Sequence, residues 1–260
     1  MQASRSIGAA VVLAAQLVVT PVFAQTTNTP DPPPHTGIRA ALATTARDFL
    51  EFPQRPSTWM ILGIGGAAAA VAHQADADTN RRLAGGRATQ RFFEPGKWAG
   101  AATVQISTAA GLYAVGRWIV SPAADGSKTN KVSHLGFDLL RAQLMSQALV
   151  RGIKSTVRRD RPTGDCCSFP SGHAVNAFAA ASVIERHLGA RAAWPTLAVA
   201  TYVGASRLHE NRHYLSDVLF GAAVGTAIGW TVVGRHGRAD YAVVPVPVRG
   251  GMAAVITRLR

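Results

Sequence analysis

Residues 170–188 have the sequence PSGHAVNAFAAASVIERHL, a turn-forming tetrapeptide that leads directly into an apolar segment. Ser171 is a residue type favoured at helix N-caps, and Gly172 allows the backbone to approach a ligand closely. Free N–H groups at the start of a helix, together with the helix dipole, can bind an anion. The stretch therefore predicts a helix over 174–188 with an anion site at its N-terminus. By itself, the tetrapeptide is equally typical of an ordinary turn before a helix.

Further segments of helix length lie on both sides of this stretch, separated by glycines, prolines and short polar runs. No period of 20–50 residues repeats, which argues against a solenoid. Two runs with β-branched residues at the C-terminus flank Gly250-Gly251 and predict a short hairpin. We expect a mainly α fold: a helical bundle of about six core helices with a short C-terminal β-hairpin. The expected core helices cover 58–75, 97–120, 134–157, 174–188, 193–207 and 214–233, and a shorter amphipathic helix covers 38–50.

The N-terminus has the pattern of a signal peptide. Arg5 supplies the positive charge, residues 7–20 are apolar, and Val22-Phe23-Ala24 provides small residues for cleavage before Gln25. The apolar run is shorter than a membrane-spanning helix, which favours cleavage and export over an uncleaved anchor. The expected organisation is a signal peptide at 1–24, a Pro-rich lead with a short helix at 25–56, the main helical domain at 57–236 and the hairpin tail at 237–260.

Composition narrows the classes of function. Hydrophobic residues make up 48% of the 260 residues and charged residues only 16%, which suits closely packed helices in water or in lipid. The formal net charge of +13 favours anionic partners such as phosphate esters or an anionic membrane surface. No basic run interleaved with aromatics and no zinc-finger spacing occurs, so we expect no nucleic-acid partner.

The expected helices do not have the composition of typical membrane spans. They are rich in Ala and Gly rather than in Leu and Phe. The segment 134–157 also carries Asp138 and Arg141, each of which is costly at the centre of a bilayer. These features favour a soluble or surface-associated bundle over a membrane-spanning one.

The two cysteines of the chain, Cys166 and Cys167, are adjacent. They cannot join distant parts of the chain, and two thiolates alone do not complete a zinc site. Two loop thiols and one strained vicinal disulfide both remain open at this point.

A pair of cations precedes the 170–188 stretch. Lys154 and Arg161 are seven residues apart, so they would project from one face of a continuous helix, and the proline after Arg161 would end that helix. Alone, the pair is also explained as a solvated basic face, because Arg151, Arg158 and Arg159 surround it.

A second group of polar residues follows the stretch. Arg207 can bind phosphate oxygens as a bidentate fork and offset charge that develops in a transition state. His213 and Asp217 are four residues apart, which would place them on one helical face. A carboxylate that accepts from one imidazole nitrogen fixes the tautomer and leaves the other nitrogen as a nucleophile. Alone, this spacing is more typical of a surface pair.

Together, the three motifs K(x)6RP at 154–162, PSGH at 170–173 and SR(x)5H(x)3D at 206–217 resemble the signature of the type 2 phosphatidic acid phosphatase (PAP2) superfamily. That superfamily also includes bacterial non-specific acid phosphatases and vanadium-dependent haloperoxidases. The resemblance covers about residues 98–234, and every signature position is filled without substitution. It implies a helical bundle with the site at one end and hydrolysis without a metal.

The resemblance also implies a role for each matched residue. His213 would attack phosphorus and form a phosphohistidine, and Asp217 would orient it. His173 would protonate the leaving oxygen and later help to activate water. The phosphoryl oxygens would be held by the other matched residues, which are Lys154, Arg161, Ser171, the Gly172 amide and Arg207.

The expected function is that of an exported, metal-independent phosphatase that acts on phosphate monoesters or pyrophosphates. Its substrate would be a phosphorylated lipid, such as phosphatidate or undecaprenyl pyrophosphate, or a small phosphomonoester. No cofactor is expected, and vanadate would inhibit. The expected location is the periplasm, or the cytoplasmic membrane with the site facing outward.

Two alternatives remain. One is a haloperoxidase in which His213 binds vanadate as the cofactor, and the short loop between Arg161 and Pro170 argues against it. The other is a non-catalytic, anion-binding envelope protein, and the complete set of signature residues argues against that.

Overall fold

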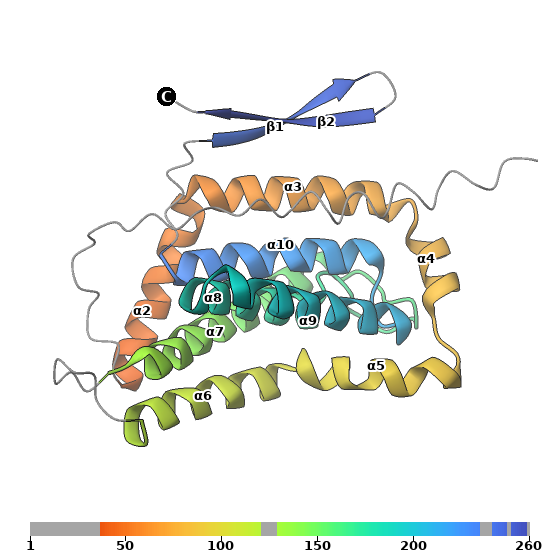
Figure 1. The fold of residues 1–260 in the computed structure, drawn as a ribbon. Helices are drawn as coiled ribbons and strands as arrows, with labels where there is room; N and C mark the ends of the chain where they lie inside the picture. Colours follow the sequence, from red (N-terminus) through yellow and green to blue (C-terminus); the bar gives the residue numbers. More distant parts are fainter. Residues whose placement is uncertain (1–36, 121–128, 235–240, 249–250, 259–260) are drawn as a thin grey trace, which may run out of the picture. The chain divides into compact units, whose positions relative to one another are not determined.

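The computed structural model describes residues 37–120, 129–234, 241–248 and 251–258. The described residues are mainly helical, as expected, and contain nine α-helices (Figure 1). The predicted signal peptide and most of the Pro-rich lead lie outside the described residues. The helices are α2 (Ile38–Glu51), α3 (Pro56–His73), α4 (Asp76–Leu83), α5 (Arg87–Ala99), α6 (Ala102–Trp118), α7 (Lys131–Val157), α8 (Gly172–Leu188), α9 (Ala190–His209) and α10 (Leu215–Val232), with a 3-10 helix at Phe52–Gln54.

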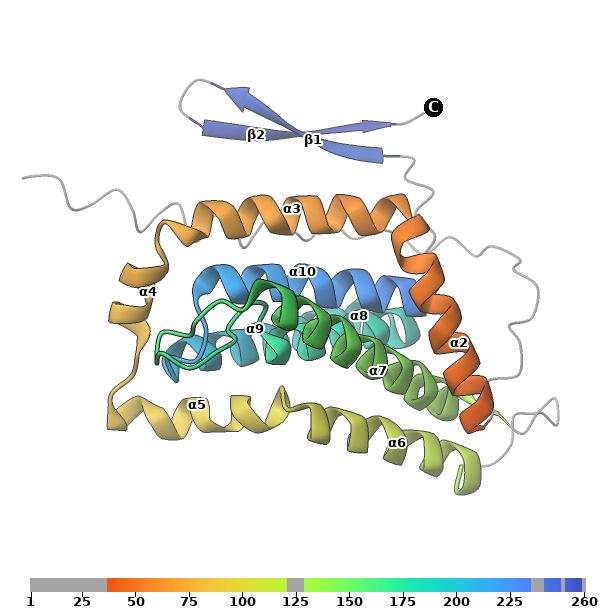
Figure 2. The same ribbon diagram turned by 180° about the vertical axis from the view of Figure 1, so that it is seen from behind.

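The core is built around α8 and α10, which run side by side (Figures 1 and 2). Glycines on α10 allow this close approach. A Cβ atom at Gly225 would lie 2.3 Å from the carbonyl oxygen of Val175, and one at Gly229 would lie 2.5 Å from Cβ of Ser182. Buried apolar side chains of α7, α8 and α10 fill the space beside this contact, among them Leu139, Met145, Val175, Val183, Val224 and Ile228.

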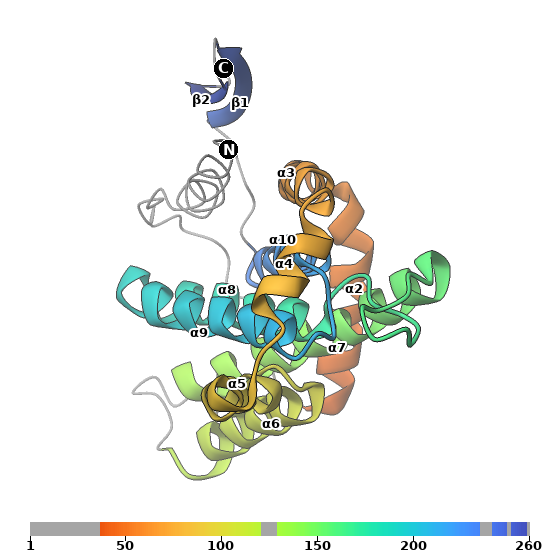
Figure 3. The same cartoon turned by 90° about the vertical axis from the view of Figure 1, so that its right-hand side faces the viewer.

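The other helices cover this core on several sides. α3 packs on α10, α9 on α8, α6 on α7 and α5 on α9. Figure 3 shows α3 on one side of the bundle and α5 with α6 on the opposite side. In α7, Arg141 donates to Asp138 (2.8 Å) and to Asp48 of α2 (2.6 Å), and all three are buried. Asp138 and Arg141, whose charges argued against a membrane-spanning helix, are therefore paired inside the protein.

One expected helix is wrong, and one observed helix was not expected. The single helix expected over 97–120 is two helices, because Ala101 has an extended backbone (φ −68°, ψ 134°) between α5 and α6. Residues 76–83 form α4, although this segment has no apolar periodicity. Its buried residues are polar, Asp76 and Asn80, so tertiary hydrogen bonds rather than an apolar stripe hold it in place.

Strands β1 (Tyr241–Val248) and β2 (Gly251–Arg258) follow at the C-terminus as an antiparallel pair. The packing that defines the fold lies in the helices, and the expected C-terminal hairpin stays a prediction.

Among the described helices, α10 is the one long and apolar enough to cross a membrane by length and composition. However, 67% of its residues are buried inside the bundle, as in the core helix of a soluble protein. Large apolar side chains are exposed on other helices instead, including Trp59 and Val71 of α3, Phe92 of α5 and Trp118 of α6. These exposed side chains make association with a membrane surface plausible.

The α8–α10 contact predicts the effect of one added methyl group. Gly225→Ala is expected to lower the melting temperature, because its Cβ would enter the backbone of α8, and overpacking of this kind costs about 1–3 kcal/mol. Thermal unfolding followed by circular dichroism measures the change. Gly63→Ala on α3 is the control, since nothing lies within 4 Å of its added Cβ. It should preserve or raise the melting temperature, and equal values for Gly225→Ala and wild type would contradict the close contact.

Candidate active site

The three sequence motifs meet where α7, α8, α9 and α10 begin or end. Lys154 lies in the last turn of α7, Ser171 and His173 at the start of α8, and Arg207 in the last turn of α9. The backbone N–H of Ser171 donates to the carbonyl oxygen of Asp217 (3.0 Å), which ties the start of α8 to the first turn of α10.

Ser171 occupies the N-cap position of α8, as expected, but its hydroxyl does not cap the helix. The side chain is fully buried, and its Oγ has no hydrogen-bond partner among the described residues. A buried hydroxyl without a partner costs about 1–3 kcal/mol. The capping role is therefore wrong, and this hydroxyl is available to a ligand at the start of the helix.

Lys154 and Arg161 do not share a helical face, because α7 ends at Val157. Arg158 adopts the left-handed conformation (φ 49°) and turns the chain into a loop. In that loop, the N–H of Arg161 donates to the carbonyl oxygen of Asp165 (2.8 Å). The expectation of a continuous helix up to Pro162 is thus wrong, and a loop brings Arg161 to the site.

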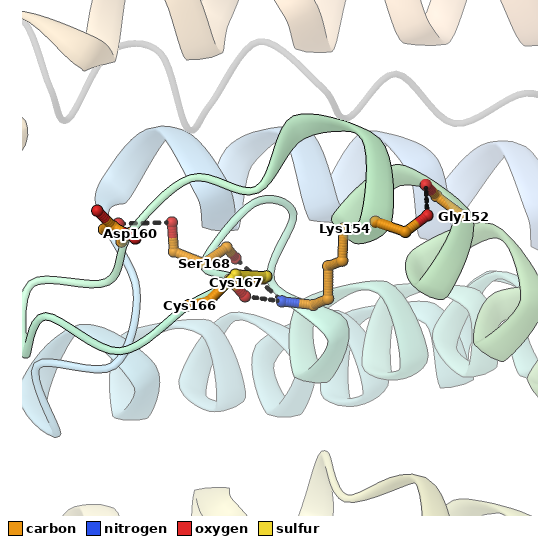
Figure 4. The surroundings of a disulfide bond; sticks show 7 residues. Gly152, Lys154, Asp160, Cys166, Cys167 and Ser168 are labelled. Carbon is orange, nitrogen blue, oxygen red and sulfur yellow. Dashed lines mark hydrogen bonds between the residues drawn. A yellow bond between two sulfur atoms is a disulfide. The ribbon is translucent and has the colours of Figure 1, made fainter.

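The same loop carries a disulfide between Cys166 and Cys167 (Figure 4). Of the two options left open by the sequence, free loop thiols and a vicinal disulfide, the structure has the disulfide. The ammonium group of Lys154 donates to the carbonyl oxygens of Cys167 and Ser168, the latter at 3.3 Å. The hydroxyl of Ser168 donates to the carbonyl oxygen of Asp160 (3.1 Å). The disulfide loop therefore holds the end of the Lys154 side chain.

His213 precedes α10 instead of lying on it. The expectation that His213 and Asp217 share one helical face is therefore wrong. The N-terminal turn of α10 brings them together. Oδ2 of Asp217 accepts from the N–H of Tyr214 (2.8 Å) and lies 3.6 Å from Nδ1 of His213. Oδ1 of Asp217 accepts from Nη1 of Arg159 (2.8 Å). Both members of the pair are buried, and the Asp217 side chain is fully so.

The environment keeps both imidazoles neutral at pH 7. Burial lowers the pKa of His213, and the charges of Lys154 and Arg207 act in the same direction against Asp217. The pKa of His173 falls to about 3, through burial first and then through Arg207 and His213. Nε2 of His173 lies 3.2 Å from the carbonyl oxygen of Lys97. Because a carbonyl only accepts, Nε2 of His173 carries a proton and Nδ1 is the acceptor of the neutral ring.

The cations of the site are close enough to affect one another. Burial, and then the charge of Arg161, lowers the pKa of Lys154 to about 8. Burial also lowers the pKa of Arg207, although its ion pair with Glu210 (3.0 Å) opposes this shift. A tetrahedral oxyanion would offset this crowding of positive charge.

Buried polar atoms without partners are concentrated in this site. Nine such side-chain atoms occur within the described residues, and five of them belong to residues that the sequence assigned to the site. These five are Nε of Arg161, Oγ of Ser171, Nε and Nη1 of Arg207 and Nδ1 of His213. Guanidinium and hydroxyl donors suit phosphate oxygens, and they suit vanadate oxygens equally. No group of three or more His, Cys, Asp or Glu side chains in the described ranges could hold a metal ion.

Sequence reasoning missed two supports of the site, α4 and Arg159. Asn80 of α4 donates to the carbonyl oxygen of His213 (3.2 Å), and Asp76 of α4 accepts from the N–H of Ser216 (2.9 Å). These partners are 133 and 140 residues apart in the chain, so no local spacing could have indicated them. Arg159 was grouped with a basic surface because arginines surround it in the sequence.

A cavity of about 410 Å³ adjoins the site. It reaches Lys97, whose carbonyl oxygen contacts His173, and Glu210, whose carboxylate pairs with Arg207. Polar side chains predominate around it. The lining residues are Ala84, Gly85, Gln90, Glu94, Lys97, His209, Glu210 and Asn211.

Comparisons with known proteins agree with the motifs. Residues 163–240 match the sequence model of the PAP2 superfamily. Over 99 residues the chain is 40% identical to a lipid A 1-phosphatase of Porphyromonas gingivalis, a match that covers 35% of this chain and 22% of that protein. Over 114 residues it is 28% identical to a lipid A 4'-phosphatase of Helicobacter pylori, covering 38% and 56%. The matches thus span less than two thirds of the length of these relatives.

The fold has a counterpart among solved structures. It is similar to a transmembrane PAP2-type phosphatidylglycerolphosphate phosphatase from Bacillus subtilis, with a TM-score of 0.52 and 20% identity. The similarity covers 74% of this chain and 94% of that one, and it supports the helical fold.

The lowered pKa of Lys154 predicts how anion binding depends on pH. Sulfate keeps its charge between pH 6 and 10, whereas Lys154 loses its proton as the pH rises through about 8. Loss of a charge-assisted hydrogen bond should weaken sulfate binding roughly tenfold between pH 7 and pH 9.5, as measured by calorimetry. Lys154→Arg stays charged and should show no such decline. Parallel declines in the two proteins would exclude Lys154 as the titrating group.

Proposed function

The chain belongs to the PAP2 superfamily, and from this premise we propose that it is an exported phosphatase that hydrolyses phosphate esters or anhydrides of lipids. One observation carries the proposal. Four buried donor atoms that lack partners belong to the signature residues Arg161, Ser171 and Arg207, and a neutral, buried His213 lies in the same site. Such a set of donors stabilises a phosphoryl group while a nucleophile attacks it.

In the proposed reaction, Nε2 of His213 attacks phosphorus, and the bond from phosphorus to the leaving oxygen breaks. The electron pair of that bond goes to the leaving oxygen, which takes a proton from His173. Water then attacks the phosphorus of the phosphohistidine while His173 accepts a proton of that water. The bond from phosphorus to Nε2 of His213 breaks, its electron pair returns to Nε2, and phosphate leaves. Asp217, close to Nδ1 of His213, orients the ring and offsets its positive charge.

His173 must gain a proton before it can act as an acid, since its pKa of about 3 leaves it neutral. The substrate itself provides the change. A bound phosphate places negative charge beside the ring, between His173 and the cations that lower its pKa. The acid is thus charged only when a phosphate group is present.

The proposed chemistry does not need a metal. Lys154, Arg161 and Arg207 supply the positive charge that a divalent ion would bring to a phosphoryl group. Magnesium and calcium sites are built from carboxylate oxygens, and the described cradle offers cationic and hydroxyl donors instead.

The surroundings of the site support a lipid substrate with a polar headgroup. The polar cavity is lined by Lys97 and Glu210, which contact His173 and Arg207, and its polar wall suits a headgroup that carries hydroxyl groups. Exposed apolar side chains on α3, α5 and α6 suit contact with the acyl region of a lipid. Two relatives that the chain matches in sequence are lipid A phosphatases, in agreement with a phosphorylated lipid as the substrate.

Substitution of the two histidines tests the reaction. His213→Ala is expected to abolish hydrolysis of every substrate, because it removes the attacking atom. His173→Ala should slow alkyl phosphates by roughly 10²–10⁴-fold and affect 4-nitrophenyl phosphate much less, since a nitrophenolate leaves without a proton. Steady-state assays in EDTA measure both, and rapid quenching should trap acid-labile phosphate on wild type. Appreciable turnover by His213→Ala, or activity that EDTA abolishes and a divalent metal restores, would contradict the proposal.

The polar cavity predicts a selective loss of activity. Glu94→Ala removes a hydrogen-bonding group from the cavity wall and should lower kcat/KM for glucosamine 1-phosphate about tenfold. Hydrolysis of 4-nitrophenyl phosphate, which has no such hydroxyl groups, should stay within about twofold of wild type. Asp78→Ala, on the exposed side of α4, is the matched control and should change neither rate. Equal losses on the two substrates would exclude the cavity as the headgroup site.

A further inference from the structure

Arg159 makes an unusual number of contacts for a residue between a helix and a loop. Its Nη1 donates to Oδ1 of Asp217 and to Oγ of Ser216, both at 2.8 Å. Its Nη2 donates to Oδ2 of Asp76, also at 2.8 Å, and lies 3.2 Å from Nδ1 of His73 on α3. The guanidinium plane lies over the ring of Tyr214, 4.1 Å from the centroid. One side chain thus contacts α4, the N-cap of α10 and the buried carboxylate beside His213.

The hydrogen bonds of Asp217 connect Arg159 to His213. Each of its oxygens already accepts a hydrogen bond at 2.8 Å, one from Arg159 and one from the N–H of Tyr214. His213 is farther away, with 3.6 Å between its Nδ1 and Oδ2 of Asp217. The guanidinium of Arg159 therefore offsets much of the negative charge of Asp217. The two hydrogen bonds also fix the rotamer of the Asp217 side chain beside His213.

α4 holds the other side of this arrangement. Oδ1 of Asp76 accepts from the N–H of Ser216 (2.9 Å), and its Oδ2 accepts from the hydroxyl of the same residue (2.6 Å). Burial raises the pKa of Asp76, but the bonds from Arg159 and Ser216 outweigh that effect and keep the pKa below its usual range. Arg159 is therefore shared between two buried carboxylates, one on each side of the loop that carries His213.

We infer that Arg159 is a positioning residue for the nucleophile: it acts through Asp217 to keep His213 oriented and uncharged. The inference rests on the proposed function, in which His213 attacks phosphorus. The inference also predicts a change in the pKa of His213, which can be measured without any substrate.

The sign of the effect follows from the charges around His213. Removal of the Arg159 cation leaves the carboxylates of Asp217 and Asp76 uncompensated. A more negative environment favours the imidazolium, so the pKa of His213 should rise. The other charged or titratable groups of the site are Lys154 of α7, Arg161 of the loop, His173 of α8 and Arg207 of α9. His73 of α3 contacts both Asp76 and Arg159.

The test uses two substitutions at Arg159. In Arg159→Gln the cation is lost, and the pKa of His213, followed by NMR of ¹⁵N-histidine-labelled protein, should rise by about one unit. The acidic limb of kcat/KM, which reports the free enzyme, should move to higher pH by the same amount. Arg159→Lys keeps the charge but cannot bond Asp217, Ser216 and Asp76 together. Its His213 pKa should stay near that of wild type, while kcat falls on the order of 10-fold.

Arg158→Gln is the matched control, because it removes the same charge from the exposed neighbouring position. It should leave the His213 pKa and the pH profile unchanged. An unchanged His213 pKa in Arg159→Gln, or an equal shift in Arg158→Gln, would overturn the inference. A wild type that binds phosphate but hydrolyses nothing would instead refute the proposed function, and the NMR titration would still decide the role of Arg159.

Discussion

The structure of the site depends on one constraint: several cationic side chains are buried close together although they repel one another. Lys154, Arg161 and Arg207 lie in one site, and burial together with their mutual repulsion lowers the pKa of Lys154 and of Arg207. Other protein groups offset part of the unfavourable free energy of burying these cations. Lys154 bonds the carbonyl oxygens of the disulfide loop, and Glu210 pairs with Arg207. The remaining donors have no partner in the described chain, so a bound oxyanion would satisfy donors that no described protein group satisfies.

Helix packing fixes where this charge is placed. The contact between α8 and α10 is close enough that a Cβ atom at Gly221 would lie 2.8 Å from the carbonyl oxygen of Ser171. Directly above it, the N–H of Ser171 bonds the carbonyl oxygen of Asp217. The glycine of one helix and the N-cap of the other thus set the distance between the two halves of the site. Helix ends set the positions of Lys154, Ser171 and Arg207, and the loops that carry Arg161 and His213 are tied to these ends by hydrogen bonds.

The sequence indicated which residues lie close together better than it indicated their local geometry. Fixed intervals between Lys154, His173 and His213 were enough to indicate the family and the mainly helical fold, because chemistry constrains residue types at those positions. The assumption that a spacing of seven or four means one helical face failed at both ends. α7 stops before Arg161, and α10 starts after His213.

The supports of the site could not be predicted from the sequence, for a different reason. α4 has no apolar stripe, and Asp76 is held by hydrogen bonds to residues 140 positions away in the chain. Arg159 stands among arginines that look alike in the sequence. Only the turn of the chain at Arg158 decides which of them faces Asp217. Single-residue patterns carry no information about such long-range pairing, whereas apolar periodicity and motif spacing carry a great deal.

The two histidines need opposite protonation states in the proposed reaction, although both lie among the same cations. A bound phosphate raises the pKa of each, so a difference between their surroundings must separate them. His213 is almost fully buried, and the carboxylate beside it is already bonded to Arg159. His173 is less buried, and its Nε2–H donates to the carbonyl oxygen of Lys97, a contact that favours the charged ring. In the proposed reaction, the proton that arrives with the substrate therefore goes to Nδ1 of His173, while His213 keeps the lone pair that attacks phosphorus.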